Sequence, residues 1–296
     1  MSLLISLALG LCLSLVIGMF AYRRGSLTPS GVLGAVITGT AIFGFGGFVP
    51  SLLLVMFFVS SSLFSHYKAR VKEQFSEKFQ KGSRRDLGQA LANGGWAALV
   101  ALFIGAAQWN QWGARVQMLA AAAFVGAIAT VTADTWATEI GVLSKSLPRM
   151  ITNGRVVPAG TSGGITRLGT FVAFCGAAFI GIVSVLGARW IALEDVWLGV
   201  TGNDISSVLV AGGFFFIAII ALSGLGGALF DSLLGATVQA IYFCEYDETQ
   251  TEKKVHGCGR TTRRVRGWEW LDNDMVNFLA SVFGSLMAVV LVYFGL

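Results

Sequence analysis

Eight apolar runs, separated by polar connections of very different length, organise this sequence. A helix that crosses a membrane needs roughly 20 apolar residues, and most of the runs approach or exceed that length. The second and third runs are shorter and rich in Gly and Ser, which is also typical of a re-entrant pair. The pattern predicts an all-α, polytopic membrane helix bundle of about seven to eight spans. The runs cover residues 3–22, 31–45, 51–65, 89–107, 118–143, 168–188, 208–230 and 275–294.

The basic residues are confined almost entirely to alternate connections. Of the 21 Lys and Arg residues, all but Arg115 and Arg189 follow the first, third, fifth or seventh run. Because cytoplasmic loops of membrane proteins carry an excess of Lys and Arg, these four connections are predicted to be cytoplasmic and both chain termini to lie outside. The basic connection over residues 68–85 is expected to face anionic headgroups, at about 1 kcal/mol per cation.

The composition is that of a membrane protein. Hydrophobic residues make up 55% of the chain and charged residues only 12%, whereas a soluble domain carries about 25% charged residues. The 38 glycines suit closely packed membrane helices. We expect residues 1–296 to form a single integral membrane domain with the lipid bilayer as its partner and no nucleic-acid partner. A homodimer is compatible with the sequence but is not required by it.

Two acidic residues, Asp134 and Glu139, lie in the fifth apolar run. A charged group at the centre of a spanning helix costs about 2.5 kcal/mol or more, so this pair indicates a functional site. The alternative is that the acids are buried and hydrogen-bonded for helix packing. On one continuous helix, side chains five residues apart point about 140° away from each other. The two acids are therefore expected to hold different groups unless the helix breaks between them.

Further polar side chains lie at the predicted cytoplasmic ends of other spans. Asp231 follows the seventh run, Asp274 precedes the eighth with Asn277 one turn further on, and Asn93 is near the start of the fourth. Carboxylate oxygens suit Mg²⁺, a hard cation. Helix capping is the structural alternative for the two aspartates. We predict a polar cavity that opens to the cytoplasm, where Asp134, Asp231 and Asp274 bind Mg²⁺.

A short hairpin and a glycine-rich loop are predicted after the fifth span. The pair Asn153-Gly154 predicts a tight turn, and residues 158–169 contain several glycines before the next apolar run. Glycines allow consecutive backbone N–H groups to converge on an anion. The loop matches neither the P-loop nor the dinucleotide-binding fingerprint. Its candidate phosphate-binding residues, with the preceding cations, are Lys145, Arg149, Gly160, Thr161, Gly163 and Gly164.

Cys244, His256 and Cys258 lie in the connection after the seventh run. These residue types can bind a soft metal ion. Their spacing, however, lacks the paired C-x-x-C pattern of structural zinc sites. The sequence therefore favours a simple loop fold over a metal site here.

Five motifs carry a resemblance to a known family, and they cover residues 85–95, 133–141, 158–169, 230–236 and 273–278. With them, the chain resembles the transmembrane protein 19 family, which includes the plant phytyl-phosphate kinase of tocopherol synthesis. The resemblance extends over nearly the whole chain.

The chain is also distantly similar to CDP-diacylglycerol synthases. Those enzymes have an acidic motif, then Ser-Lys, then a glycine loop, and residues 144–145 and 160–164 follow the same order here. The loop lacks their His, and Arg167 and Thr170 stand in a region where they carry acids. These departures favour a shared nucleotide and lipid-phosphate site over cytidylyl transfer.

The family resemblance implies Mg²⁺-dependent phosphoryl transfer from CTP or ATP to an isoprenoid (phytyl or prenyl) monophosphate, which gives the diphosphate. Family kinship favours CTP. The site would lie on the cytoplasmic face of the cell or inner membrane. The implied catalytic residues are Asp134, Glu139, Lys145 and Asp231. The implied nucleotide- or phosphate-binding residues are Asn93, Lys145, Arg149, Gly160, Thr161, Gly163, Gly164 and Asn277.

Three other functions remain open from the sequence. A lipid-alcohol kinase would use the same site, with an acid that accepts the hydroxyl proton. A CDP-lipid cytidylyltransferase would release pyrophosphate. A cation-coupled transporter also uses intramembrane acids, but it binds its substrate near the midplane, whereas the acids here cluster towards one face.

Overall fold

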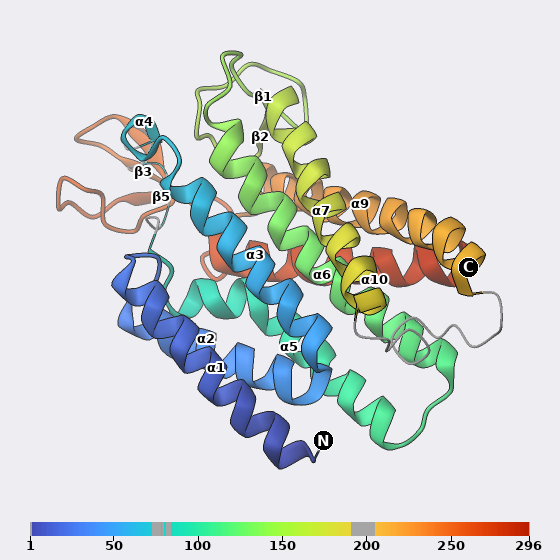
Figure 1. The fold of residues 1–296 in the computed structure, drawn as a ribbon. Coiled ribbons are helices and arrows are strands. Elements are labelled where there is room, and N and C mark those ends of the chain that lie inside the picture. Colours follow the sequence, from blue (N-terminus) through green and yellow to red (C-terminus); the bar gives the residue numbers. More distant parts are fainter. Residues whose placement is uncertain (1, 73–77, 79, 81–83, 191–204, 296) are drawn as a thin grey trace.

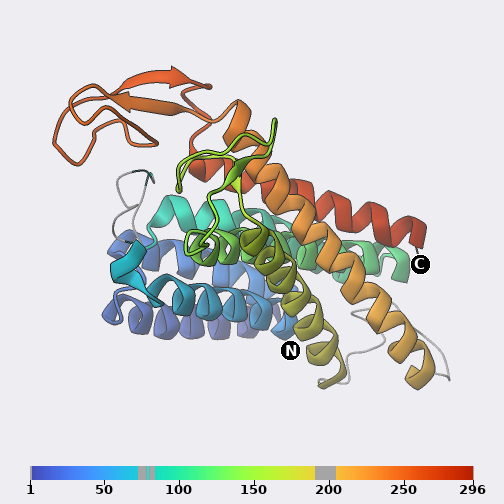
Figure 2. The ribbon, with the colours of Figure 1, turned by 90° about the horizontal axis from the view of Figure 1, so that it is seen from above.

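The computed structural model describes residues 2–72, 78, 80, 84–190 and 205–295 as a bundle of long helices with two small β-sheets at one end (Figures 1 and 2). Within these residues, eight helices are long and apolar enough to cross a membrane. The predicted all-α, polytopic helix bundle is therefore confirmed.

The first three spans form one side of the bundle. They are α1 (Leu3–Arg23), α2 (Pro29–Ala41) continued by the π-helical turn η1 (Ile42–Gly46), and α3 (Phe48–His66). Gly47 alone joins η1 to α3, with a φ of 82° that favours glycine. Both of the helices that it joins meet the length and hydropathy of a span. A short helix, α4 (Ala69–Lys72), follows α3.

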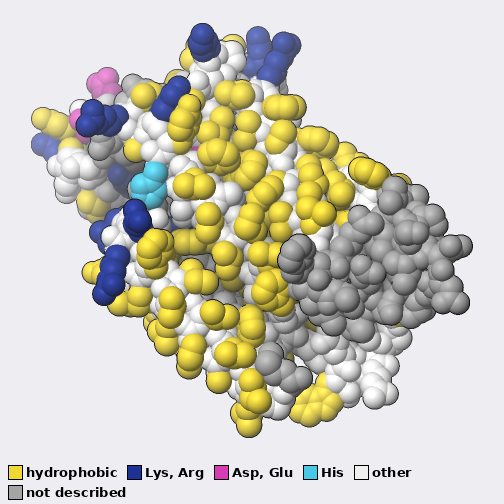
Figure 3. Space-filling view, in the orientation of Figure 1, with side chains coloured by type: hydrophobic (Ala, Val, Ile, Leu, Met, Phe, Trp, Pro, Cys, Tyr) yellow, Lys and Arg dark blue, Asp and Glu magenta, His cyan; other side chains and the backbone are white. Residues whose placement is uncertain are grey.

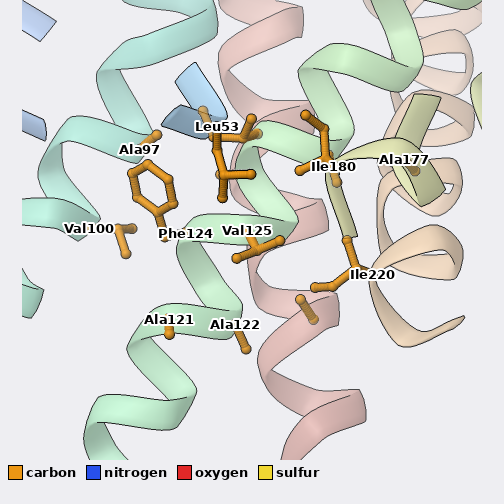
Figure 4. Packing of buried hydrophobic residues seen from close by; sticks show 14 of the residues in the cluster. Leu53, Ala97, Val100, Ala121, Ala122, Phe124, Val125, Ala177, Ile180 and Ile220 are labelled. Carbon is orange, nitrogen blue, oxygen red and sulfur yellow. The ribbon is translucent and has the colours of Figure 1, made fainter. Parts of the chain in front are cut away.

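The remaining spans surround α6 (Ala114–Gly141), which is buried on every side from Ala120 to Ala122 and from Phe124 to Ala133. A helix that is apolar all round belongs in the interior. In Figure 4, Phe124 lies beside Ala97 and Val100, whereas Val125 faces the side of Ile180 and Ile220. The helices around α6 include α3 and α5 (Leu87–Trp109), α7 (Arg167–Trp190), α9 (Ile205–Thr237) and α10 (Asn273–Gly295).

The helices α6, α9 and α10 cross at very short range around Thr130. A Cβ on Gly227 of α9 would lie 2.4 Å from Thr130 Oγ1, and a Cβ on Gly284 of α10 would lie 1.8 Å from the same atom. No side chain larger than hydrogen fits at either position. The crossing therefore fixes α9 and α10 against one face of α6.

One predicted boundary is wrong. The seventh span was expected to end at residue 230, but α9 continues to Thr237. The apolar residues after Asp231, Leu233 and Leu234, sustain the helix for almost two further turns. Asp231 is therefore part of the helix and does not follow it.

Both β-sheets lie at the same end of the bundle, opposite the two termini (Figure 1). The predicted tight turn at Asn153-Gly154 is present, because Arg149 pairs antiparallel with Val156 across it. In addition, β1 (Arg149–Met150) pairs antiparallel with β2 (Gly164–Ile165). A three-stranded antiparallel sheet, not predicted from the sequence, follows α9 with the order β4-β3-β5. Its strands are β3 (Ile241–Cys244), β4 (Thr249–Thr251) and β5 (Arg263–Arg266).

The charged side chains gather at this same end. Figure 3 shows Lys and Arg side chains over the hairpin, the α4 region and the three-stranded sheet, and hydrophobic side chains over the described helix faces. An apolar outer face suits a lipid environment. The side of the membrane to which the sheet-bearing end belongs stays a prediction from the basic loops.

Candidate functional site

Asp134 and Asp231 lie side by side at the sheet-bearing end of the bundle. Thr130 touches the backbone at Gly227, and both α6 and α9 run from this contact towards the sheets. Each aspartate comes one helical turn, about 6 Å, beyond the contact. The carboxylate charge of Asp134 accordingly acts on Asp231. Asp231 Oδ2 is buried and has no hydrogen-bond partner among the described residues.

A third carboxylate, Glu252, reaches this pair from the three-stranded sheet. Its charge acts on both Asp134 and Asp231. Its side chain accepts hydrogen bonds from the backbone N–H of Gln80 (3.1 Å) and from Gln239 Nε2 (3.0 Å). This role could not be predicted from the sequence, because Glu252 lies in a polar stretch that looks like an exposed loop. Only the fold of the sheet brings it to the helices.

The environment of Glu252 disfavours its charged form. Burial raises the pKa of Glu252 to about 7, and the charges of Asp272 and Asp274 act in the same direction. The hydrogen bonds from Gln80 and Gln239 oppose this pKa shift but do not cancel it. An additional positive charge at this place would therefore be strongly attracted.

The N-terminus of α10 completes the carboxylate cluster, which we define as Asp134, Asp231, Glu252 and Asp274. Asp272 Oδ1 accepts a hydrogen bond from the backbone N–H of Met275 (3.1 Å), so Asp272 caps the helix. Its other oxygen accepts a hydrogen bond from Gln80 Nε2 (3.3 Å). Asp274 Oδ1 is buried in the first turn of α10, and Asn277 is half-buried one turn further on.

The glycine loop docks onto α9 one turn beyond Asp231. A Cβ on Gly235 would lie 2.7 Å from Ser162 Oγ, and a Cβ on Gly163 would lie 2.6 Å from Ala236 Cα. Because residues four apart share a helix face, Gly235 lies directly above Asp231. The loop therefore covers the carboxylate cluster on its sheet-bearing side.

Hydrogen bonds connect the loop to Glu252. Ser162 Oγ donates to Gln239 Oε1 (2.7 Å), and Gln239 in turn donates to Glu252. Lys78 Nζ donates to the carbonyl of Ala159 (2.6 Å). Within the loop, Thr161 Oγ1 donates to the carbonyl of Pro158 and Gly164 N–H donates to the carbonyl of Thr161, which closes a turn. The turn spans three predicted phosphate-binding residues, Thr161, Gly163 and Gly164, and follows directly on Gly160.

Glu139 belongs to a separate polar cluster. It accepts hydrogen bonds from Ser65 Oγ (2.6 Å) and Lys72 Nζ (2.5 Å), and its charge acts on Arg85. Since α6 continues without a break to Gly141, Glu139 points away from Asp134, as the helix geometry requires. The side chains of Lys72 and Arg85 are directed inwards and are largely buried. The predicted contact with headgroups is therefore wrong for these two cations.

Of the two predicted phosphate-binding cations, Arg149 lines a groove outside the cluster. The groove has a volume of about 880 Å³ and lies between the hairpin, α7 and Leu225 of α9. Arg149 and Arg167 line it, together with the apolar side chains of Phe171 and Phe174 of α7. The guanidinium of Arg149 also donates to the carbonyl of Gly154 (2.9 Å). Lys145 is exposed and does not line this groove.

Asn93 is placed elsewhere. It lines a mostly apolar cavity of about 240 Å³ that is bounded by α1, α2, η1, α3 and α5, together with Arg85 and Gln89. The structure therefore does not bring Asn93 into the carboxylate cluster by any described contact.

Replacing Gly163 with Ala is expected to displace the loop from α9. The φ of 81° at Gly163 and the overlap with Ala236 both oppose a methyl group, at a strain of order 1–3 kcal/mol. Gly154 is the matched control, because it has a φ of 69° but no atom within 4 Å of the added Cβ. Limited proteolysis of the loop should accelerate in Gly163→Ala and not in Gly154→Ala. Equal cleavage of both variants would show that the docking is not what orders the loop.

The fold and the site define an integral membrane protein whose spanning helices hold a carboxylate cluster under a glycine loop. The chain belongs to the family described as Integral membrane protein DUF92, which matches residues 12–285. The family resemblance inferred from the motifs is thereby confirmed.

Similar proteins occur in a plant, an archaeon and a cyanobacterium. Protein PGR of Arabidopsis thaliana is 30% identical over 283 residues, which cover 93% of this chain and 92% of PGR. An uncharacterized membrane protein of Methanocaldococcus jannaschii is 27% identical over 98% of this chain and 96% of its own length. Protein VTE6, chloroplastic, of Arabidopsis thaliana is 24% identical over 90% of this chain and 66% of VTE6. No solved structure gave a significant match.

Proposed function

We propose that this membrane protein is a Mg²⁺-dependent phosphotransferase that moves a phosphoryl group from CTP or ATP to an isoprenoid monophosphate. The observation that carries the proposal is the convergence of Asp134, Asp231 and Glu252 from three separate elements beneath the glycine loop. The resemblance to the phytyl-phosphate kinase family supports the substrate class.

The carboxylate cluster fits a divalent cation. Its members repel one another, and a buried oxygen of Asp231 has no hydrogen-bond partner among the described residues. Mg²⁺ prefers such oxygen ligands and retains several waters. Asp134 and Asp231 would hold the ion, with Asp274 as a further ligand, and the ion would neutralise charge on the donor phosphates.

The chain's own groups would then align the two phosphates. Backbone N–H groups of the glycine loop would bind the donor, because the loop lies directly above Asp231. The acceptor phosphate oxygen attacks the terminal phosphorus of the donor, the bond to the bridging oxygen breaks, and the nucleoside diphosphate leaves. The acceptor is already anionic, so alignment and charge neutralisation suffice without a strong general base.

The groove beside the hairpin suits the lipid acceptor. Its cations, Arg149 and Arg167, would bind the acceptor phosphate, and Phe171 and Phe174 would contact the apolar tail within the bilayer. The loop joins this groove to the carboxylate cluster, because Gly163 packs on α9 while Ile165, two residues later, lines the groove. On this proposal Arg149 would bind the acceptor phosphate and not the donor.

The test is direct. Purified protein is incubated with Mg²⁺, labelled CTP or ATP, and either a prenyl monophosphate or the matching prenol. We expect the prenyl diphosphate and a nucleoside diphosphate as products. Phosphorylation of the prenol alone would identify a lipid-alcohol kinase, and release of pyrophosphate would identify a cytidylyltransferase. Absence of turnover with any lipid would favour the transporter.

Arg167→Gln is expected to weaken acceptor binding. Loss of one charge-assisted hydrogen bond to the acceptor phosphate should raise the KM for prenyl phosphate about tenfold while kcat changes less. Arg155→Gln is the control, since Arg155 is exposed in the same hairpin but does not line the groove. Initial rates against acceptor concentration would measure both. An unchanged KM in Arg167→Gln would place the acceptor elsewhere.

A further inference from the structure

Four side chains of the three-stranded sheet and its loops meet at one point away from the carboxylate cluster. They are Cys244 at the end of β3, Asp247 in the following turn, and His256 and Cys258 in the loop after β4. One potential ligand atom from each lies within 4.8 Å of all the others. Cys244 and His256 are buried, whereas Asp247 and Cys258 are exposed. The group is therefore half-enclosed at the surface of the sheet.

The separations match those of a tetrahedral metal site. The sulfur atoms of Cys244 and Cys258 lie 3.7 Å apart, and two thiolates on one tetrahedral zinc ion, each at about 2.3 Å, lie about 3.8 Å apart. Cys244 Sγ is 3.9 Å from Asp247 Oδ2, and His256 Nδ1 is 2.8 Å from the same oxygen. Shifts of less than about 1 Å would bring all four donors to zinc-binding distances.

The backbone around these residues is built to hold them. The backbone N–H of His256 donates to the carbonyl of Arg260 (2.9 Å), and Gly259 N–H donates to the carbonyl of His256 (2.9 Å). Gly259 has a φ of 80°, which tightens the turn that contains Cys258. The turn presents His256 and Cys258 from one side and β3 presents Cys244 from the other.

The sheet also needs a stabilising cross-link, because it has little hydrophobic core of its own. Its strands have four, three and four residues, and several large apolar side chains of this lobe are exposed, among them Tyr246, Val255 and Trp268. Small lobes of this kind are commonly stabilised by disulfides or by a structural metal ion. Two thiolates with one imidazole and one carboxylate are a donor set that suits Zn²⁺.

We propose that Cys244, Asp247, His256 and Cys258 bind one structural Zn²⁺ ion, which fixes the three-stranded sheet and its loops in one conformation. The sheet is also the element that carries Glu252, four residues before His256. Zinc would thereby hold Glu252 over Asp134 and Asp231. The zinc site itself does not depend on the function proposed above, because it is defined by its own four ligands.

Metal content tests the proposal without any assay of turnover. Protein purified under reducing conditions from zinc-supplemented cells is expected to contain about one zinc per chain, as measured by elemental mass spectrometry. Replacement of zinc by Co²⁺ should give the intense visible and near-ultraviolet bands of a tetrahedral thiolate site. Cys258→Ser should lose the zinc and these bands. Cys258 is exposed, so the substitution should leave the membrane helices folded and affect only the order that zinc gives to the sheet.

The two other cysteines provide matched controls. Cys12→Ser and Cys175→Ser alter membrane helices far along the chain from the sheet and should retain the zinc. Wild-type protein that takes up neither zinc nor cobalt after reduction would overturn the proposal. So would a Cys258→Ser protein with as much zinc as Cys12→Ser. A protein that binds zinc but transfers no phosphoryl group would uphold the metal site and count only against the proposed function.

Discussion

Asp231→Asn is expected to abolish phosphoryl transfer while the protein remains folded. The substitution removes one negative charge but keeps the shape of the side chain. A ligand that helps Mg²⁺ neutralise the phosphates contributes several kcal/mol to the transition state, so turnover should fall by at least about a hundredfold. The measurement is the Mg²⁺-dependent conversion of labelled prenyl phosphate to the diphosphate.

Thermal unfolding separates this role from a structural one. The charges of Asp134 and Glu252 act on Asp231 as like charges, so neutralising Asp231 should leave the unfolding temperature in EDTA unchanged or raise it. The stabilisation that Mg²⁺ gives the wild-type protein should disappear in the variant. Glu269→Gln is the control, because Glu269 is an exposed acid paired with Lys254 at 3.0 Å. Near-normal turnover in Asp231→Asn would remove this residue from the metal site.

The architecture of the membrane domain could be predicted because lipid imposes simple rules on sequence. Spanning helices need long apolar runs, and all eight runs became helices. The predicted end of α9 was wrong because it depends on contacts between helices, which the apolar pattern does not show. A single acid in an apolar run predicts the end of a span, yet Asp231 is accommodated inside the helix by the close crossing at Gly227 and by the glycine loop above it. Tertiary contacts, invisible in the local pattern, decide such a boundary.

The candidate site could be predicted only where polar groups stand in apolar surroundings. Asp134 and Asp231 were conspicuous because a carboxylate in an apolar run is costly. Glu252 was not, because it lies among Thr, Gln and Lys residues and acquires its role from the register of a short sheet. Gln239 is indicated only weakly by the sequence, as one polar residue between the apolar Val238 and Ala240. The structure buries it.

For Cys244, His256 and Cys258 the sequence favours a simple loop fold, and it does not indicate Asp247 at all, for a related reason. Spacing rules recognise ligands that come in pairs from one turn, such as C-x-x-C. Here one thiolate comes from the end of a strand, the carboxylate from the next turn, and the other two ligands from a loop after a second strand. No pattern along the chain defines such a set. Antiparallel pairing of β3 with β4 and β5 brings the four together.

The affinity of the carboxylate cluster for Mg²⁺ is expected to fall as the pH is lowered through about 7, and Glu252→Gln should reduce this dependence. The pKa of Glu252 is raised from 4.5 to about 7, first by burial and then by the acids of α10. The acids that face it are Asp134 of α6, Asp231 of α9, and Asp272 and Asp274 at the start of α10.

The sign of the effect follows from which state holds the proton. Without Mg²⁺, folded Glu252 binds a proton more tightly than in the unfolded chain, so its contribution to stability falls as pH rises from 4.5 to about 7. Mg²⁺ binds the ionised form, so its stabilising effect grows over the same range. Between pH 6 and pH 8 the ionised fraction rises about tenfold, and the Mg²⁺ affinity should rise by about the same factor.

Titration of Mg²⁺ against the unfolding temperature at pH 6 and pH 8 would measure this change. In Glu252→Gln the affinity should be weak at both pH values, and turnover should fall with it, because a neutral amide cannot compensate the ion's charge. Glu248→Gln is the control: Glu248 lies in the turn between β3 and β4, on the same sheet. A wild-type affinity that does not change with pH, or a Glu252→Gln variant with the wild-type dependence, would exclude Glu252 from the site.

Because Glu252 reaches the helices only through the sheet, removal of zinc should weaken Mg²⁺ binding in the wild-type protein and have little further effect in Glu252→Gln.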